Sequence, residues 1–235
     1  MIVLMFGAPG CGKGTQASFI ASRFRIPAIS TGDLLRAELK AGTPLGRQAS
    51  AVLEQGGLVS DELVNQMVAA RLLQPDCSHG FLLDGFPRTP AQAAFLDALL
   101  RQRHLPEPMV IHLDVPVSVL VSRISARRQC PQCGKIYNLL SHPPRVDGVC
   151  DGDGTALACR ADDNGTVVRD RQKAYQELTG PVIAHYRGRR YHRLNGDRAP
   201  QEVGREIEHL LLQTAAPAMR RPEFRVKPAQ AGAPA

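Results

Sequence analysis

Residues 2–15 read IVLMFGAPGCGKGT, and this stretch decides the fold. The apolar run 2–6 is typical of a strand buried on both faces of a parallel sheet. A glycine-rich loop, 7–15, follows at once, and residues from about 13 to 24 are expected to form a helix. A strand, such a loop and a helix together predict a phosphate-binding loop, in which backbone N–H groups and the helix N-terminus face phosphate oxygens. Lys13 is expected to reach the β- and γ-phosphates, although Gly14 stands where the general pattern has Ser or Thr, and Thr15 comes one residue later.

The rest of the chain alternates helical and extended patterns. Short apolar runs predict strands at 81–84, 109–113 and 191–194, and helical patterns cover 31–40, 61–73, 90–100, 117–128, 166–187 and 201–213. This alternation predicts an α/β fold built on a parallel sheet. We expect Ala91, Phe95 and Leu99 on the apolar face of helix 90–100. Arg123 and Arg127 are expected four residues apart on helix 117–128.

Composition limits the classes of function. The net charge of +7 and the pI near 9.4 suggest partners that carry phosphate, which can be nucleotides or polynucleotides. The chain has no Trp and only 5% aromatic residues, so it has few side chains on which the bases of a nucleic acid could stack. It has no apolar run of membrane-spanning length, and its first residues read as a buried strand and not as a signal peptide. We therefore expect a cytoplasmic protein, with a disordered tail over 215–235 that is rich in Ala, Pro and Arg.

Four of the six cysteines fall between residues 130 and 159, in a segment rich in Gly, Pro and Asp. Cys130 and Cys133 form a C-x2-C knuckle, and Cys150 and Asp153 repeat that spacing with a carboxylate in last place. Two such knuckles can hold one tetrahedral Zn²⁺ with no open position, which predicts a structural metal. Cys159 is the alternative fourth ligand, although its spacing from Cys150 does not fit a knuckle.

Four further segments, together with the glycine-rich loop, identify a family. They are STGDLLR at 30–36, DGFPR at 84–88, DVP at 114–116 and RADD at 160–163. In this order and spacing they closely resemble adenylate kinase of the bacterial type with a long, zinc-binding lid, over residues 1 to about 213. The resemblance implies a P-loop nucleoside monophosphate kinase fold. It also implies reversible, Mg²⁺-dependent transfer of a phosphoryl group from ATP to AMP, giving two ADP.

The resemblance also implies roles for individual residues. The AMP pocket matches Thr31, Arg36, Gly57, Val59, Gly85, Arg88 and Gln92. The surroundings of ATP and the transferred phosphate match Gly10, Gly12, Lys13, Gly14, Thr15, Arg123, Arg127, Arg160, Arg171 and Arg198. The catalytic residues expected from the match are Lys13, Arg88, Arg123, Arg160, Arg171 and Asp84, the last of which would orient waters on Mg²⁺. Asp33 and Asp162 match acids that hold arginines of the site or help the lid to close.

The expected organisation has four parts. A core P-loop domain takes 1–29, 61–127 and 163–214; an AMP-binding segment takes 30–60; a zinc-stapled lid takes 128–162; and the tail follows from 215. The expected partners are ATP, AMP and ADP, with no nucleic acid or membrane, and we expect a monomer. Two alternatives stay open at this point, a kinase specific for UMP or CMP and, from another class, a nucleic-acid-binding zinc ATPase.

Overall fold

The protein folds around a parallel sheet. In this computed structural model, which describes residues 1–54, 59–159 and 172–215, the central sheet is five-stranded with the order β2-β3-β1-β4-β7. Every pair of neighbouring strands in it is parallel. The strands span β1 Ile2–Gly7, β2 Ala28–Ser30, β3 Phe81–Asp84, β4 Met109–Asp114 and β7 Tyr191–Asn195. The predicted α/β class and parallel sheet are therefore confirmed.

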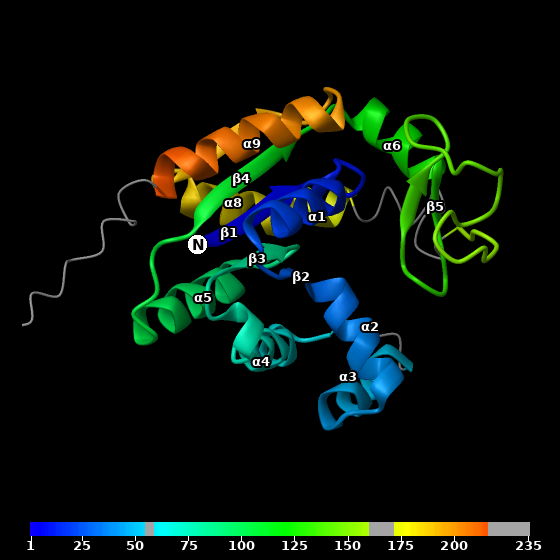
Figure 1. Ribbon diagram of the computed structural model, residues 1–235. Coiled ribbons are helices and arrows are strands. Elements are labelled where there is room, and N and C mark those ends of the chain that lie inside the picture. Colours follow the sequence, from blue (N-terminus) through cyan, green and yellow to red (C-terminus); the bar gives the residue numbers. More distant parts are fainter. Residues whose placement is uncertain (55–58, 160–171, 216–235) are drawn as a thin grey trace, which may run out of the picture.

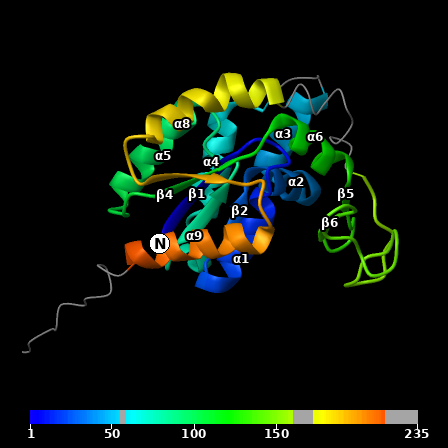
Figure 2. The ribbon, with the colours of Figure 1, turned by 90° about the horizontal axis from the view of Figure 1, so that it is seen from above.

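Helices cover both faces of this sheet (Figures 1 and 2). On one face lie α1 and α9, and on the other lie α4, α5 and α8. Their bounds are α1 Lys13–Phe24, α4 Asp61–Arg71, α5 Pro90–Gln102, α8 Gly180–Tyr186 and α9 Pro200–Ala215. A 3-10 turn, Pro75–Cys77, leads into β3, and a π-helix, Tyr175–Thr179, runs directly into α8. No helix of the described segments is both long and apolar enough to cross a membrane.

The first strand is the centre of the core. All of its residues are buried, as the unbroken apolar run predicts. Ile2, Leu4 and Phe6 pack toward α4, α5 and α8, whereas Val3 and Met5 pack toward α1 and α9. Because strand side chains alternate between faces, one short apolar strand joins both halves of the core. Its carboxyl end is thereby held rigidly where the glycine-rich loop begins.

Two parts project from the carboxyl end of the sheet (Figure 1). One is the helix pair α2, Thr31–Ala41, and α3, Pro44–Glu54, which packs with α4 through a small apolar cluster around Ala49, Leu63 and Met67. The other is a segment of turns around the antiparallel hairpin β5, Arg127–Gln129, and β6, Ile136–Asn138. Helix α6, Val117–Ser125, leads from β4 into this second part, which we call the lid.

Some expectations from the sequence are wrong in detail. Helix α6 ends at Ser125, so Arg127 opens a strand and does not share a helix with Arg123. Its backbone pairs with Asn138 across the hairpin, and this long-range pairing replaces the last helical turn. Strand β2 and helix α3 were not predicted, and the part of helix 166–187 that precedes residue 172 lies outside the described residues.

The apolar face expected on helix 90–100 is also wrong. Ala91 is exposed, and Phe95 and Leu99 are only partly buried. The buried face instead includes Gln92 and Asp97, two polar residues.

Candidate active site

The glycine-rich loop connects β1 to α1 as the sequence predicts. Gly10 and Gly12 both have positive φ, +85° and +99°, and Gly12 is the N-cap residue of α1. A Cβ atom on Gly10 would lie 2.6 Å from Cγ1 of Ile124, so the loop can approach α6 this closely only with glycine there. A Cβ on Gly12 would meet no atom within 4 Å, so this part of the loop faces open space.

Lys13 begins α1 and its side chain folds back over the loop. Its Nζ donates hydrogen bonds to the carbonyl oxygens of Gly7, at 2.7 Å, and Ala8, at 3.2 Å. The Cys11 sulfur lies 3.8 Å from the same Nζ. Cys11 is only 2% exposed, and burial raises the pKa of its thiol. It therefore fills a small apolar position and is a poor nucleophile.

A cavity of about 810 Å³ lies at the carboxyl end of the sheet, between the loop, α2, α6 and the lid. That volume suits ligands larger than a single nucleobase. Most of the predicted site residues line it, although they come from segments far apart in the chain. They are Gly10, Gly12, Lys13, Gly14, Thr15, Arg36, Asp84, Gly85, Arg88, Arg123, Arg127 and Arg198. Five of these are arginines, so the cavity concentrates positive charge.

Arg88 on one wall is held by its neighbours. Its Nε donates to the Gly85 carbonyl at 2.8 Å, and its backbone N–H donates to Oε1 of Gln92, also at 2.8 Å. Gln92 is buried, and its Nε2 donates to Asp61 at 2.7 Å. Thr31 donates to the Gly85 carbonyl at 3.0 Å from the start of α2. This chain of bonds fixes the turn that carries Arg88 toward the cavity.

Arg36 lies on the same wall, one turn into α2. It pairs with Asp33 at 2.5 Å, and both side chains line the cavity and are more than half exposed. A surface pair of this kind contributes little to stability. Arg36 can therefore exchange Asp33 for another anion at small cost.

The opposite wall is formed by α6 and the loop that follows β7. Arg123 donates through Nη1 to the Gly196 carbonyl at 2.9 Å and pairs with Asp197 at 3.3 Å. Arg198 donates to the Asn195 carbonyl at 3.2 Å and pairs with Glu206. The guanidinium of Arg123 thus ties α6 to the loop at 196–198, and both line the cavity.

Not every predicted site residue lines the cavity. Of the described residues, Thr31, Val59 and Gln92 are not among those that line it; Thr31 and Gln92 support Gly85 and Arg88, and Val59 packs against the apolar cluster around Ala49, Leu63 and Met67. Gly57, Arg160, Asp162 and Arg171 lie outside the described residues, as does the tail from 216.

The lid contains the predicted metal-ligand cluster. The ligand atoms of Cys130, Cys133, Cys150 and Asp153 all lie within 4.8 Å of one another, and Cys159 is not in the group. The Cys133 and Cys150 sulfurs are 3.6 Å apart, and the Cys130 sulfur is 3.3 Å from Oδ2 of Asp153. Tetrahedral Zn²⁺ places two thiolate sulfurs roughly 3.8 Å apart and a sulfur and a carboxylate oxygen roughly 3.5 Å apart, so both of these separations are close to those that the ion needs. The four residues therefore fit zinc.

The two halves of this cluster have the same backbone structure. In the first, Gly134 N–H donates to the Cys130 carbonyl, and in the second, Gly154 N–H donates to the Cys150 carbonyl, both at 3.0 Å. Both glycines have positive φ, +76° and +72°, which closes the turn beneath the ligands.

Hydrogen bonds also prepare two of the ligands for a cation. A bond from the Tyr137 hydroxyl lowers the pKa of the Cys150 thiol, and the backbone N–H of Thr155 lowers the pKa of the Asp153 carboxyl. Both effects favour the deprotonated forms that bind metal.

Comparison with known proteins agrees with this geometry. The adenylate kinase family model matches residues 5–191. An adenylate kinase of Trichlorobacter lovleyi is 50% identical over 189 residues, which cover 80% of this chain and 88% of that protein. An adenylate kinase of Pseudothermotoga lettingae is 43% identical over 212 residues, 90% of this chain and 98% of that protein.

The chain belongs to the adenylate kinase family.

The protein is therefore a nucleoside monophosphate kinase, and the reaction of an adenylate kinase converts ATP and AMP into two ADP. The resemblance seen in the sequence is confirmed over most of its stated range. The family assignment also favours AMP over UMP or CMP as the phosphate acceptor. It accounts for the phosphate loop and the cysteine knuckles without the alternative of a nucleic-acid-binding zinc ATPase.

Some residues of the adenylate kinase site were missed from the sequence. Ser30 lines the cavity and also caps α2, since its Oγ accepts from Asp33 N–H at 3.3 Å. The Ser-Thr-Gly-Asp pattern carried that capping signal. Ile136, Asn138 and Leu140 of the lid also line the cavity, but no local sequence pattern distinguishes them.

Proposed function

We propose that the cavity holds the two substrates end to end, with ATP on the phosphate loop and AMP against α2 and the turn after β3. The single observation that carries this division is that cations from two groups of elements line one cavity. Lys13, Arg123 and Arg127 come from α1, α6 and β5, and Arg36 and Arg88 come from α2 and the turn after β3. Two polyanions can approach each other only where such groups offset their repulsion.

Phosphoryl transfer requires positioning and charge stabilisation more than covalent chemistry. On binding ATP, Lys13 exchanges the carbonyls of Gly7 and Ala8 for phosphate oxygens, which are stronger acceptors. Arg88 is already oriented by Gly85 and Gln92, so it can bind the acceptor phosphate through both arms of its guanidinium. No nucleophilic side chain takes part.

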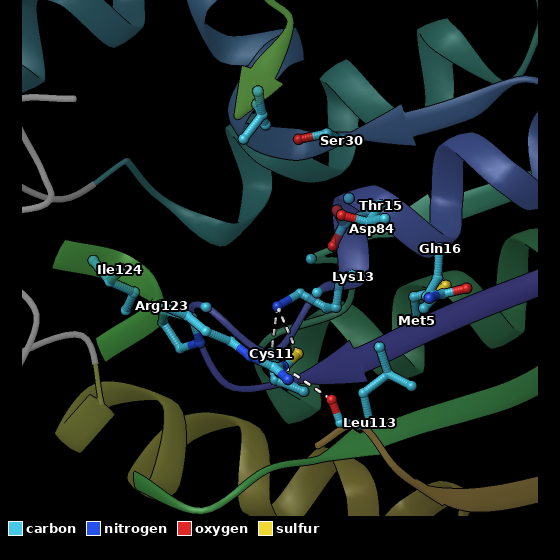
Figure 3. Close-up of a pocket in the computed structure, with 18 of the residues that line it drawn as sticks. Met5, Cys11, Lys13, Thr15, Gln16, Ser30, Asp84, Leu113, Arg123 and Ile124 are labelled. Atoms are coloured by element: carbon cyan, nitrogen blue, oxygen red, sulfur yellow. Dashed lines mark hydrogen bonds between the residues drawn. The ribbon is translucent and has the colours of Figure 1, made fainter. Parts of the chain in front are cut away.

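The residues beside Lys13 also fit Mg²⁺. Asp84 at the end of β3 and Thr15 in the first turn of α1 both line the cavity and offer oxygen atoms, the ligand type that Mg²⁺ prefers (Figure 3). Bound with ATP, the ion neutralises charge on the phosphates. Asp84 holds its place through the buried strand β3, so its carboxylate is a fixed acceptor for magnesium-bound waters.

Zinc in the lid serves structure. The side chains of Cys130, Cys133, Cys150 and Asp153 would supply all four ligands of a tetrahedral zinc ion, which would leave no position open for a substrate or a water. The lid and the 30–60 segment close over the nucleotides, because the reaction must exclude water to avoid hydrolysis of ATP. Arg160 and Arg171 lie outside the described residues, and their role at the transferred phosphate is proposed from the sequence resemblance alone. The enzyme acts as a monomer in the cytoplasm. Gel filtration would test the monomeric state.

A coupled assay of ADP formation tests this division of the cavity. We expect wild-type protein with ATP, Mg²⁺ and AMP to form ADP. Arg88→Ala loses charge-assisted hydrogen bonds worth about 1.5 to 3 kcal/mol each, so kcat/KM for AMP should fall about 10² to 10⁴-fold. The matched control is Arg101→Ala, which removes an exposed arginine of α5 that does not line the cavity. Equal activity in the two variants would contradict the role of Arg88.

Replacement of AMP by UMP, CMP or GMP in the same assay tests base specificity. We expect AMP to give the highest kcat/KM. Stronger activity on UMP or CMP would show that the acceptor site reads a pyrimidine.

A further inference from the structure

A single amide side chain joins the lid to the helix that carries Arg123. Asn138 is the last residue of β6, and its Nδ2 donates to the backbone carbonyl of Arg123 at 2.9 Å. That carbonyl belongs to the last turn of α6, where carbonyls have no partner within the helix. The lid therefore supplies, through Asn138, a cap for the helix on which it is mounted.

The other end of the same side chain shapes the edge of the lid. Oδ1 of Asn138 accepts from the backbone N–H groups of Leu140 and Ser141, at 3.0 and 3.1 Å. The backbone of Asn138 exchanges two further bonds with His142, at 3.1 and 2.8 Å. One residue thus closes the turn from which Leu140 and Ser141 line the nucleotide cavity.

These contacts lie at the junction between the lid and the core. Asn138 pairs with Arg127 across the hairpin, and the next residue, Leu139, donates its N–H to the Ala126 carbonyl at 2.9 Å. Asn138 itself lines the cavity beside Arg123 and Arg127. We call residues 138–141 the inner edge of the lid. Its position relative to Arg123 and Arg127 therefore depends on the Asn138 side chain.

We propose that Asn138 is a positioning residue for the donor nucleotide, which sets the inner edge of the lid against Arg123 and Arg127. It acts through the turn at 138–141 and through α6, and it takes no part in the chemistry. The inference rests on the proposed assignment of ATP to the phosphate-loop end of the cavity. None of the hydrogen bonds of Asn138 given above goes to Arg36 or Arg88 on the acceptor wall.

Two substitutions separate the functions of the side chain. Asn138→Asp keeps an oxygen for the N–H groups of Leu140 and Ser141 but removes the donor to the Arg123 carbonyl. Asn138→Ala removes both sets of bonds. The control is Asp147→Ala, which removes an exposed carboxylate of the lid that lies outside the metal-ligand cluster and does not line the cavity.

Steady-state kinetics with each substrate varied in turn, together with zinc content per chain, give the test. We expect KM for ATP to rise about five-fold or more in Asn138→Ala, which loses the bond to the Arg123 carbonyl, and at least as much in Asn138→Asp, which loses the same bond and adds a negative charge to the cavity. KM for AMP and zinc content should stay at the wild-type values, and Asp147→Ala should match wild type throughout. An unchanged KM for ATP, an equal rise in KM for both substrates, or loss of zinc from both variants would overturn the proposal. Wild-type protein without ADP-forming activity would instead contradict the proposed function.

Discussion

Removal of the lid metal is the perturbation whose consequence follows most directly from the structure. The apolar cluster of the lid consists of Cys130, Tyr137 and Cys150, with Leu157 packed against it. Two of these are metal ligands, so Tyr137 and Leu157 supply the apolar contribution, about 1.5 to 3 kcal/mol for each buried side chain. Structural zinc sites contribute about 10 kcal/mol or more to folding. If zinc occupies the proposed site, the metal and not the apolar cluster holds the lid.

The size of the effect on melting can be estimated. Free zinc at 1,000 times its dissociation constant stabilises the folded state by about 4 kcal/mol. For a chain of this length that corresponds to a change in Tm of about 8 to 16 °C. Chelation should lower Tm by this amount. Turnover at low temperature should change much less, because the phosphate loop, Arg36 and Arg88 lie outside the lid.

Calorimetry and metal analysis measure both quantities. We expect one zinc ion per chain in wild-type protein and in the control Asp147→Ala, which removes an exposed lid carboxylate outside the cluster. Asp153→Ala should bind zinc more weakly and should melt at a lower temperature. Wild-type protein that carries no metal, or whose Tm does not respond to a chelator, would refute the argument.

Three further predictions concern the core and the phosphate loop. Burial lowers the pKa of His112 in the folded protein, so the unfolded chain takes up a proton at a higher pH than the folded chain does. The free energy of unfolding should therefore fall as the pH drops below about 6.5. Urea unfolding at several pH values should show a weaker dependence of this free energy on pH for His112→Gln. Asp97→Asn should lower the free energy of unfolding by about 1 to 3 kcal/mol, because it weakens a 2.9 Å pair with Arg189, and kcat should stay unchanged. Gly10→Ala should reduce kcat/KM about 10²-fold, because the new Cβ collides with Ile124 and shifts the loop; a variant with wild-type kinetics would contradict the close approach seen here.

Local sequence signals were sufficient where the structure depends on neighbouring residues. The buried strand β1, the loop at 7–15 and helix α1 follow from an apolar run, glycines and a lysine in immediate succession. The two metal knuckles follow from a repeated spacing, because each is a closed turn of a few residues. Helix α3 had a comparable signal that we did not use. Thr43 accepts a bond from Gly46 N–H at 3.0 Å, and Pro44 opens the helix.

Features that depend on distant partners could not be predicted in this way. Gln92 and Asp97 are buried in α5 because Asp61 of α4, and Arg189 beyond α8, satisfy their polar groups. Without those partners, polar side chains are expected to face solvent. The end of α6 has the same cause, since Arg127 leaves the helix to pair with Asn138 in the lid.

The central claim is that one cavity binds both nucleotides at once, with their phosphates end to end. Calorimetric titration with an analogue in which two adenosines are joined by five phosphates tests it most directly. We expect one molecule bound per chain, in competition with both ATP and AMP, and a smaller radius of gyration by solution scattering on binding. Two molecules per chain, or competition with only one substrate, would contradict the account.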